Sequence, residues 1–229
     1  MFEIIPGILE KQWSEIEKKI ELVKPFAKSI HVDIIDGKFS PETTFLDPTP
    51  FAKYAKDLFL EVHFMTDNPV QYLEPFAKAG FKRFIGHVEK MPDQAEFVVK
   101  AEELGEVGLA VDGATPLDKI KVPYVDLDCL VLMTIQAGKS GQTFNSEYLK
   151  KIEALRLGEK DIEIPIEIDG GINSETISLA KNKGANRFVA NSFIFNGNPQ
   201  EQFDLLTDTT TQRKTRLMGN LELISQDNP

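Results

Sequence analysis

The sequence predicts an α/β protein built as a single (β/α)8 barrel, in which eight parallel strands alternate with helices. Three observations favour this closed barrel over an open doubly wound sheet. Eight short apolar segments alternate with longer amphipathic ones, and polar residues gather where many of the apolar segments end. No G-x-G-x-x-G motif follows the first of them. We expect the barrel over residues 1–205, and a peripheral helix or partly disordered tail over residues 206–229.

The expected strands are short segments rich in β-branched and aromatic side chains. Near-continuous apolar runs of this length are typical of parallel strands that are buried on both faces. In chain order, the expected strands lie at 2–5, 29–34, 58–63, 84–88, 107–111, 129–134, 164–168 and 187–190.

The segments between the strands carry apolar residues at helical spacing. Ile16, Ile20 and Val23, for example, fall on one face of a helix. Gly80 and Gly184 stand where two other helices should stop, because glycine readily takes the left-handed conformation that ends a helix. The expected helices lie at 10–24, 48–56, 69–79, 92–104, 145–155, 174–183 and 198–205, with one or two helical turns in the link 116–126.

The composition limits the classes of molecule that this protein is expected to bind. The 229-residue chain is 41% hydrophobic and carries a net charge of −10, which argues against nucleic acids and anionic membranes. A small phosphorylated ligand remains compatible, because backbone amides can hold a phosphate locally. Residues 1–10 lack a signal-peptide pattern, and no apolar run approaches the ~18 residues needed to span a bilayer. The lone cysteine, Cys129, is expected to be a buried free thiol, which fits the reducing cytoplasm.

Four side chains in the expected strands can form one site: His31, Asp33, His63 and Asp169. Side chains alternate between the two faces of a strand, so His31 and Asp33, two positions apart, point the same way. Two imidazoles and two carboxylates suit a first-row divalent metal ion. A pair of aspartates could also take and return a proton, and this combination predicts an enzyme.

Three further polar residues lie near these four in the sequence. Glu61 shares a strand face with His63 and is expected to support it. His87 is expected either to be structural or to support a ligand. Glu89 is expected to form a salt bridge at the rim of the barrel.

Seven short motifs follow one another along the chain: HVDIIDGKF, EVHFMTDNP, GHVE, ATP, LMTIQAGKSGQTF, EIDGGIN and VANSFIF. Together they resemble the ribulose-phosphate 3-epimerase family, with similarity from about residue 4 to residue 200. The resemblance implies a barrel of the ribulose-phosphate-binding type that interconverts D-ribulose 5-phosphate and D-xylulose 5-phosphate. By motif position it implies that Asp33 and Asp169 are the catalytic acid/base pair. It also implies one divalent ion (Zn²⁺, Fe²⁺, Mn²⁺ or Co²⁺), with four protein ligands: His31, Asp33, His63 and Asp169.

The phosphate of such a substrate needs donors that point at it. Glycines let the backbone approach an anion, and many barrels bind phosphate after strands 7 and 8. We therefore expect substrate and phosphate contacts in the loops after the last three strands, the first of these loops by resemblance. These residues are Gly138, Ser140, Gly141, Gly170, Gly171, Asn191 and Ser192. Met65 and Met133 match methionines that line the pocket in the family.

The chain departs from the family pattern around the substrate. Gly7 stands where the family usually has serine, Asn191 stands where it has glycine, and the altered loop 136–142 contains Lys139. The reaction type is therefore better defined than the substrate. Two alternatives stay open: an epimerase of another ketose phosphate, such as a ketohexose 6-phosphate, and a barrel that binds a sugar phosphate without turning it over. The resemblance also implies a homo-oligomer, a dimer or larger.

Overall fold

The predicted strands close into one parallel barrel, with neighbouring strands paired in chain order and β1 paired with β8. The computed structural model describes residues 2–138, 142–156 and 163–211. The strands are β1 Glu3–Ile8, β2 Ser29–Ile35, β3 Phe59–Met65, β4 Arg83–His87, β5 Glu106–Val111, β6 Cys129–Met133, β7 Ile166–Asp169 and β8 Arg187–Ala190. The predicted (β/α)8 barrel is confirmed.

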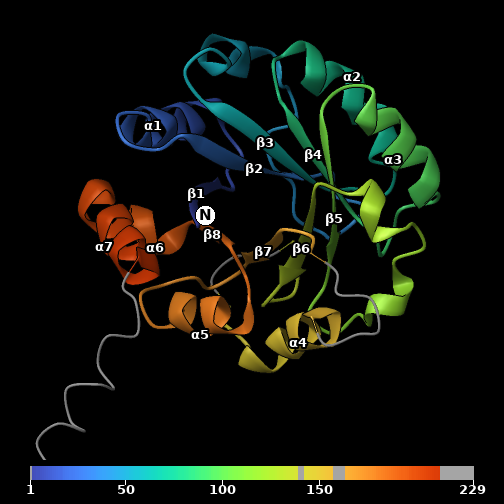
Figure 1. The fold of residues 1–229 in the computed structure, drawn as a ribbon. Helices are drawn as coiled ribbons and strands as arrows, with labels where there is room; N and C mark the ends of the chain where they lie inside the picture. Colours follow the sequence, from blue (N-terminus) through green and yellow to red (C-terminus); the bar gives the residue numbers. More distant parts are fainter. Residues whose placement is uncertain (1, 139–141, 157–162, 212–229) are drawn as a thin grey trace, which may run out of the picture.

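The helices form an outer layer around the strands (Figure 1). They are α1 Trp13–Val23, α2 Val70–Lys78, α3 Gln94–Glu102, α4 Lys150–Arg156, α5 Thr176–Lys183, α6 Ser192–Phe195 and α7 Pro199–Thr211. Short 3₁₀ helices occupy Thr49–Tyr54, Leu117–Lys119, Tyr124–Asp126 and Ser146–Leu149. Gly80 and Gly184 both have positive φ just beyond α2 and α5, as their predicted role requires.

Two helical segments differ from the prediction. The segment expected as a helix at 48–56 is a 3₁₀ helix with proline in its first turn, and its buried residues, Phe51 and Tyr54, are three apart. This spacing suits three residues per turn, so the tighter helix buries both rings. Helix α7 continues past the predicted boundary at 205, because Leu206 and Thr210 extend its buried face. Residues 212–229 of the predicted tail lie outside the described residues.

The barrel wall separates two apolar clusters. The larger cluster lies between the strands and the helices, and the smaller one, which includes Ile35, Met65, Ile85 and Met133, lies inside the barrel. Cys129 belongs to the inner cluster and is a fully buried free thiol, as predicted. Much of the remaining interior is polar or charged, and the candidate site occupies it. No helix in the described ranges has both the length and the apolar character needed to cross a membrane.

Phe76 on α2 provides a test of the outer packing. Its ring is fully buried and makes edge contacts with Phe64 and Phe81, with centroids 5.3 and 5.0 Å away. We expect Phe76→Ala to lower the free energy of unfolding by about 3–5 kcal/mol, because it removes apolar contacts and leaves a cavity. Val125, 89% exposed, is the matched control, and Val125→Ala should change stability by less than about 0.5 kcal/mol. Equal urea midpoints for the two variants would contradict this account of the core.

Candidate active site

The register of the sheet brings the four predicted ligands together. His31 and Asp33 share one face of β2, and Asp33 lies in register with His63 of β3. Asp169 is the last residue of β7. One ligand atom from each of these four side chains lies within 4.8 Å of the others. All four therefore meet inside the barrel, as the strand periodicity and the resemblance predict.

Within this cluster, Asp33 lies closest to both imidazoles. Its Oδ1 is 3.3 Å from His31 Nε2 and 3.1 Å from His63 Nδ1. Asp169 Oδ2 is 3.9 Å from the same His63 nitrogen. Both imidazoles are fully buried, whereas the two aspartate side chains remain slightly exposed and line a cavity.

The surroundings of His31 fix which of its nitrogens faces the cluster. His31 Nδ1 lies 2.6 Å from Glu61 Oε1 and 3.4 Å from Glu167 Oε1. Carboxylates accept hydrogen bonds, so Nδ1 carries a proton, and Nε2 is the nitrogen that faces Asp33. Among the described residues, Nε2 makes no hydrogen bond although it is buried. The expectation that Glu61 supports His63 is therefore wrong, because the register sets Glu61 beside His31.

His63 presents its other nitrogen to the cluster. His63 Nε2 lies 2.9 Å from His87 Nδ1, and His87 Nε2 lies 2.9 Å from Glu89 Oε2. Burial favours the neutral form of Glu89, but the hydrogen bond with His87 outweighs it and lowers the pKa of Glu89 to about 2. His87 thus lies between His63 and Glu89, with one ring nitrogen facing each of them. The other nitrogen of His63, Nδ1, is hydrogen-bonded to Asp33 Oδ1 and faces the cluster.

The donor set fits a divalent metal ion. Two imidazole nitrogens, His31 Nε2 and His63 Nδ1, converge with carboxylate oxygens of Asp33 and Asp169. The opposite nitrogen of each imidazole is held by a buried neighbour, which is how metal-binding histidines are usually oriented. The buried Nε2 of His31, which lacks a hydrogen-bond partner in the described structure, is the observation that a bound cation would explain.

The two aspartates differ in their affinity for a proton. Burial and the nearby charge of Asp33 raise the pKa of Asp169 to about 7. Burial also disfavours the charged form of Asp33, but hydrogen bonds and charges from His31 and His63 outweigh it and hold its pKa well below the usual value. Burial lowers the pKa of His63 to about 4, so that imidazole is neutral near pH 7. Around neutral pH, the carboxyl group of Asp33 is thus ionised, whereas that of Asp169 is protonated part of the time.

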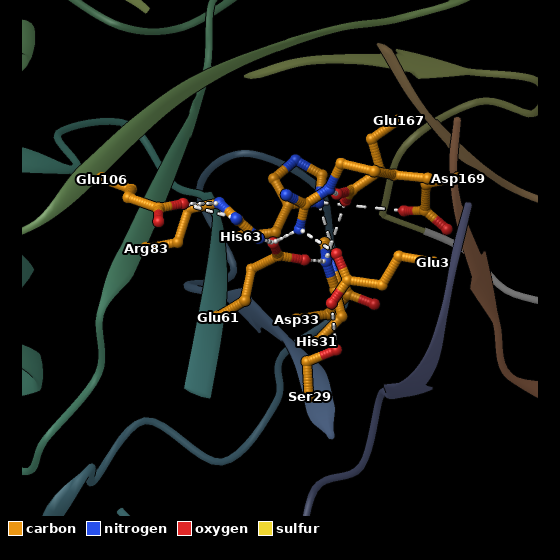
Figure 2. A network of polar contacts seen from close by, with 11 residues as sticks. Glu3, Ser29, His31, Asp33, Glu61, His63, Arg83, Glu106, Glu167 and Asp169 are labelled. Atoms are coloured by element: carbon orange, nitrogen blue, oxygen red, sulfur yellow. Dashed lines mark hydrogen bonds and ion pairs between the residues drawn. The ribbon is translucent and has the colours of Figure 1, made fainter. Parts of the chain in front are cut away.

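A charged layer lies behind His31, away from the cavity (Figure 2). Glu61 and Glu167 are fully buried there and meet two arginines. Arg187 Nη2 donates to Glu61 at 2.9 Å, Arg187 Nε donates to Glu167 at 2.9 Å, and Arg83 donates to Glu61 as well. For Glu61, the neighbouring His31 and Arg83 outweigh the cost of burial and lower its pKa. For Glu167, burial and the charge of Glu61 prevail and raise its pKa to about 8.

This layer was not anticipated from the sequence, although signals for it exist. Glu61 and Glu167 each stand two residues before a predicted ligand and so share its strand face. Arg83 and Arg187 lie in register with Glu61 and Glu167, respectively. An acidic residue two places before a ligand, facing an arginine on the next strand, is the pattern that would have revealed it.

The described candidate substrate residues line one cavity of about 450 Å³ together with Asp33 and Asp169. They are Gly138, Gly170, Gly171, Asn191, Ser192, Met65 and Met133. Ser140 and Gly141, with Lys139 between them, lie outside the described residues. Two of the four metal-ligand candidates, Asp33 and Asp169, therefore share one cavity with the described phosphate candidates. It lies at the carboxyl ends of the strands, where barrel enzymes place their active sites.

Two of these positions require glycine. Gly170 and Gly171 have φ of +115° and +66°, which L side chains rarely adopt. A Cβ at Gly170 would lie 2.6 Å from Ile135 Cγ1, and one at Gly171 would lie 3.0 Å from Phe144 Cβ. The backbone after β7 can approach a ligand closely only because both side chains are absent.

Two departures from the family pattern are neighbours in space. A Cβ at Gly7 would lie 2.8 Å from Val189 Cγ1 and 3.5 Å from Asn191 Cβ. Asn191 Oδ1 in turn accepts a hydrogen bond from Lys19 Nζ at 3.2 Å. Lys19 also lines the cavity, and sequence reasoning missed it. Its helical spacing predicts only a position beside the buried face of α1.

Comparisons with known proteins agree with this geometry. Residues 3–195 match the model of the "Ribulose-phosphate 3 epimerase family". The ribulose-phosphate 3-epimerase of Schizosaccharomyces pombe is 33% identical over 207 residues, covering 87% of this chain and 90% of that protein. The ribulose-phosphate 3-epimerase of Bacillus subtilis is 34% identical over 204 residues, covering 85% and 93%.

Solved structures support the fold at much lower identity. The 3-hexulose-6-phosphate synthase of Salmonella typhimurium aligns with a TM-score of 0.68 and 13% identity, covering 91% of this chain and 98% of that one. A tryptophan synthase structure from Mycobacterium tuberculosis aligns with a TM-score of 0.66 and 11% identity, covering 93% and 94%. These likenesses concern the barrel alone. The family match spans most of the chain, and its relatives exceed 30% identity over most of their length, so this protein is an isomerase that belongs to the ribulose-phosphate 3-epimerase family.

Proposed function

We propose that this protein is a metal-dependent 3-epimerase that interconverts D-ribulose 5-phosphate and D-xylulose 5-phosphate. The observation that carries the proposal is the pair Asp33 and Asp169. Both line one cavity beside a buried imidazole pair, and their environments push their pKa values apart. Membership in the family supports the choice of substrate.

The chemistry needs two proton-transfer groups. The proton on the carbon beside the ketone must leave from one face, and inversion requires a proton to arrive at the opposite face. Asp33 stands on β2 and Asp169 on β7, which are separated by β1 and β8 around the barrel. The ionised Asp33 accepts the proton while Asp169, which holds one, donates from the other side. The two residues exchange roles when the reaction runs in reverse.

The cluster of His31, Asp33, His63 and Asp169 would hold one divalent ion. That ion would supply Lewis-acid stabilisation of the negative charge that develops on the substrate when the proton leaves. Zn²⁺, Fe²⁺, Mn²⁺ and Co²⁺ all suit two imidazoles and two carboxylates, so cellular supply would select among them.

The other end of the cavity would hold the sugar phosphate. Gly138, Gly170, Gly171, Asn191 and Ser192 line it, and the two glycines after β7 let backbone amides approach the anion. Ser140 and Gly141 remain part of the proposed set by resemblance. We place the enzyme in the cytoplasm as a homo-oligomer, on the basis of its buried free thiol and the family resemblance.

The decisive test is proton exchange from heavy water into ketose phosphates. Metal-loaded protein should epimerise D-ribulose 5-phosphate and incorporate deuterium beside the ketone. Asp33→Asn and Asp169→Asn should each lower the rate of epimerisation by about 10²–10⁴-fold, because each removes one proton-transfer group. Asp126→Asn, at an exposed position, should leave the rate unchanged.

Two results of this assay would contradict the proposal. Near-normal exchange in either aspartate variant, with its metal content confirmed, would remove that residue from the mechanism. Clearly faster turnover of a ketohexose 6-phosphate than of the pentose phosphate would show that the six-carbon ketose phosphate is the substrate.

His87 should strengthen metal binding without touching the metal. Its Nδ1 lies 2.9 Å from His63 Nε2 and so holds the imidazole with its other nitrogen facing Asp33. We expect His87→Phe to weaken Zn²⁺ affinity by about 10–100-fold, measured by competition with a chelator. Glu89→Gln keeps a carbonyl acceptor for His87 and should have a smaller effect. Wild-type affinity in a folded His87→Phe variant would disprove this supporting role.

Metal affinity should rise with pH around neutrality. The pKa of Asp169 is raised to about 7, so below that pH a proton competes with the metal ion for this carboxyl group. Apparent affinity should therefore increase from about pH 6 to about pH 8, with proton release on binding. Calorimetry in buffers of different ionisation enthalpy measures that release. Constant affinity across this range would contradict the assigned protonation of Asp169.

A further inference from the structure

Lys19 reaches the cavity from outside the barrel wall. It lies on α1 between Ile16 and Ile20, which are buried against the barrel. Its side chain is only 18% exposed, and its Nζ lies 4.6 Å from the centre of the Phe195 ring. The ammonium group thus lies over the Phe195 ring, and both residues line the cavity.

Two oxygens hold the ammonium group of Lys19. Nζ donates to Asn191 Oδ1 at 3.2 Å and lies 2.7 Å from Glu10 Oε1. An ammonium group has three donors, so these contacts orient it and still leave one donor for a ligand. Asn191 stands directly before Ser192, a proposed phosphate contact, and both line the cavity.

The other charged side chains of the cavity lining give the positive charge of Lys19 its importance. Three carboxylates line it: those of Glu10, Asp33 and Asp169. Lys19 is the single cationic side chain among its described lining residues. The whole chain has a net charge of −10, so no general attraction favours an anionic substrate. A phosphate dianion therefore gains most from the positive charge of Lys19 on this lining.

We infer that Lys19 is a specificity-determining residue that recognises the phosphate dianion of the substrate, with Asn191 positioning its ammonium group. The inference rests on the proposed function. In the free enzyme, Lys19 pairs with Glu10. The incoming phosphate then either shares the ammonium group with Glu10 or replaces Glu10 as its partner. A charge-assisted hydrogen bond of this kind is among the stronger polar contacts a protein makes.

The test separates charge from packing. Lys19→Met removes the ammonium group and keeps an unbranched side chain beside Phe195. In metal-loaded protein, we expect it to raise the KM for D-ribulose 5-phosphate about 10–100-fold, with a much smaller change in kcat. Inhibition by inorganic phosphate should weaken by a similar factor. Lys18→Met, on the exposed face of the same helix, is the matched control and should match the wild type.

Two further comparisons distinguish recognition from a structural ion pair. D-Ribulose without its phosphate should react equally slowly with wild type and Lys19→Met, because the lost contact concerns the phosphate alone. Lys19→Arg keeps a cation and should recover part of the affinity for phosphate. If Lys19→Met fails to fold, Lys19→Arg is the variant to compare with the wild type. A purely structural Lys19–Glu10 pair predicts instead that Lys19→Met and Glu10→Gln both lower thermal stability while KM stays unchanged.

The outcomes separate this inference from the proposed function. Turnover by the wild type with an unchanged KM in folded Lys19→Met overturns the role of Lys19 and leaves the epimerase intact. Absence of turnover in the wild type overturns the epimerase. Calorimetric binding of inorganic phosphate, compared between wild type and Lys19→Met, then decides the role of Lys19 without any reaction.

Discussion

The geometry of the site depends on how the fully buried carboxylate of Glu61 is shared. One oxygen accepts from His31 Nδ1, and the other meets Arg83 and Arg187. The first contact decides which nitrogen of His31 faces the cluster. The second provides the positive charge without which an ionised carboxylate in the barrel interior would be too costly. The orientation of His31 is therefore set by ion pairs that never reach the cavity.

A second polar chain performs the same task for His63 by a different route. His87 is the last residue of β4 and lies beside Glu89, whereas Glu61 and Glu167 stand two residues before His63 and Asp169 on their strands. The two imidazoles are therefore oriented from different levels of the barrel. They consequently offer unlike nitrogens, Nε2 of His31 and Nδ1 of His63. The cavity itself is polarised as well. Its two aspartates stand at one part of the wall, and the Lys19–Asn191 pair stands near the loop after β8.

Residues governed by local periodicity could be predicted from the sequence, whereas those governed by register could not. The spacing of two between His31 and Asp33 determines that both face inward, whatever the neighbouring strands do. The partner of Glu61 depends instead on the register between β2 and β3. That register places Glu61 beside His31, whereas the sequence suggested His63 as its partner. Lys19 was out of reach for a related reason. Only the packing of α1 beside the loop after β8 brings its ammonium group to Asn191.

The pairing of β1 with β8 has a consequence for the biogenesis of this protein. Helix α7 lies over that seam, contacting β1, α1 and α5, and Phe203 packs its ring 5.1 Å from that of Phe26. A polypeptide emerging from the ribosome makes β1 first and its partner β8 last. Until translation reaches the final strand, β1 has an open edge that can pair with another chain. Closure of the barrel is thus a late event, because the pairing of β1 with β8 forms only after the last strand has been made.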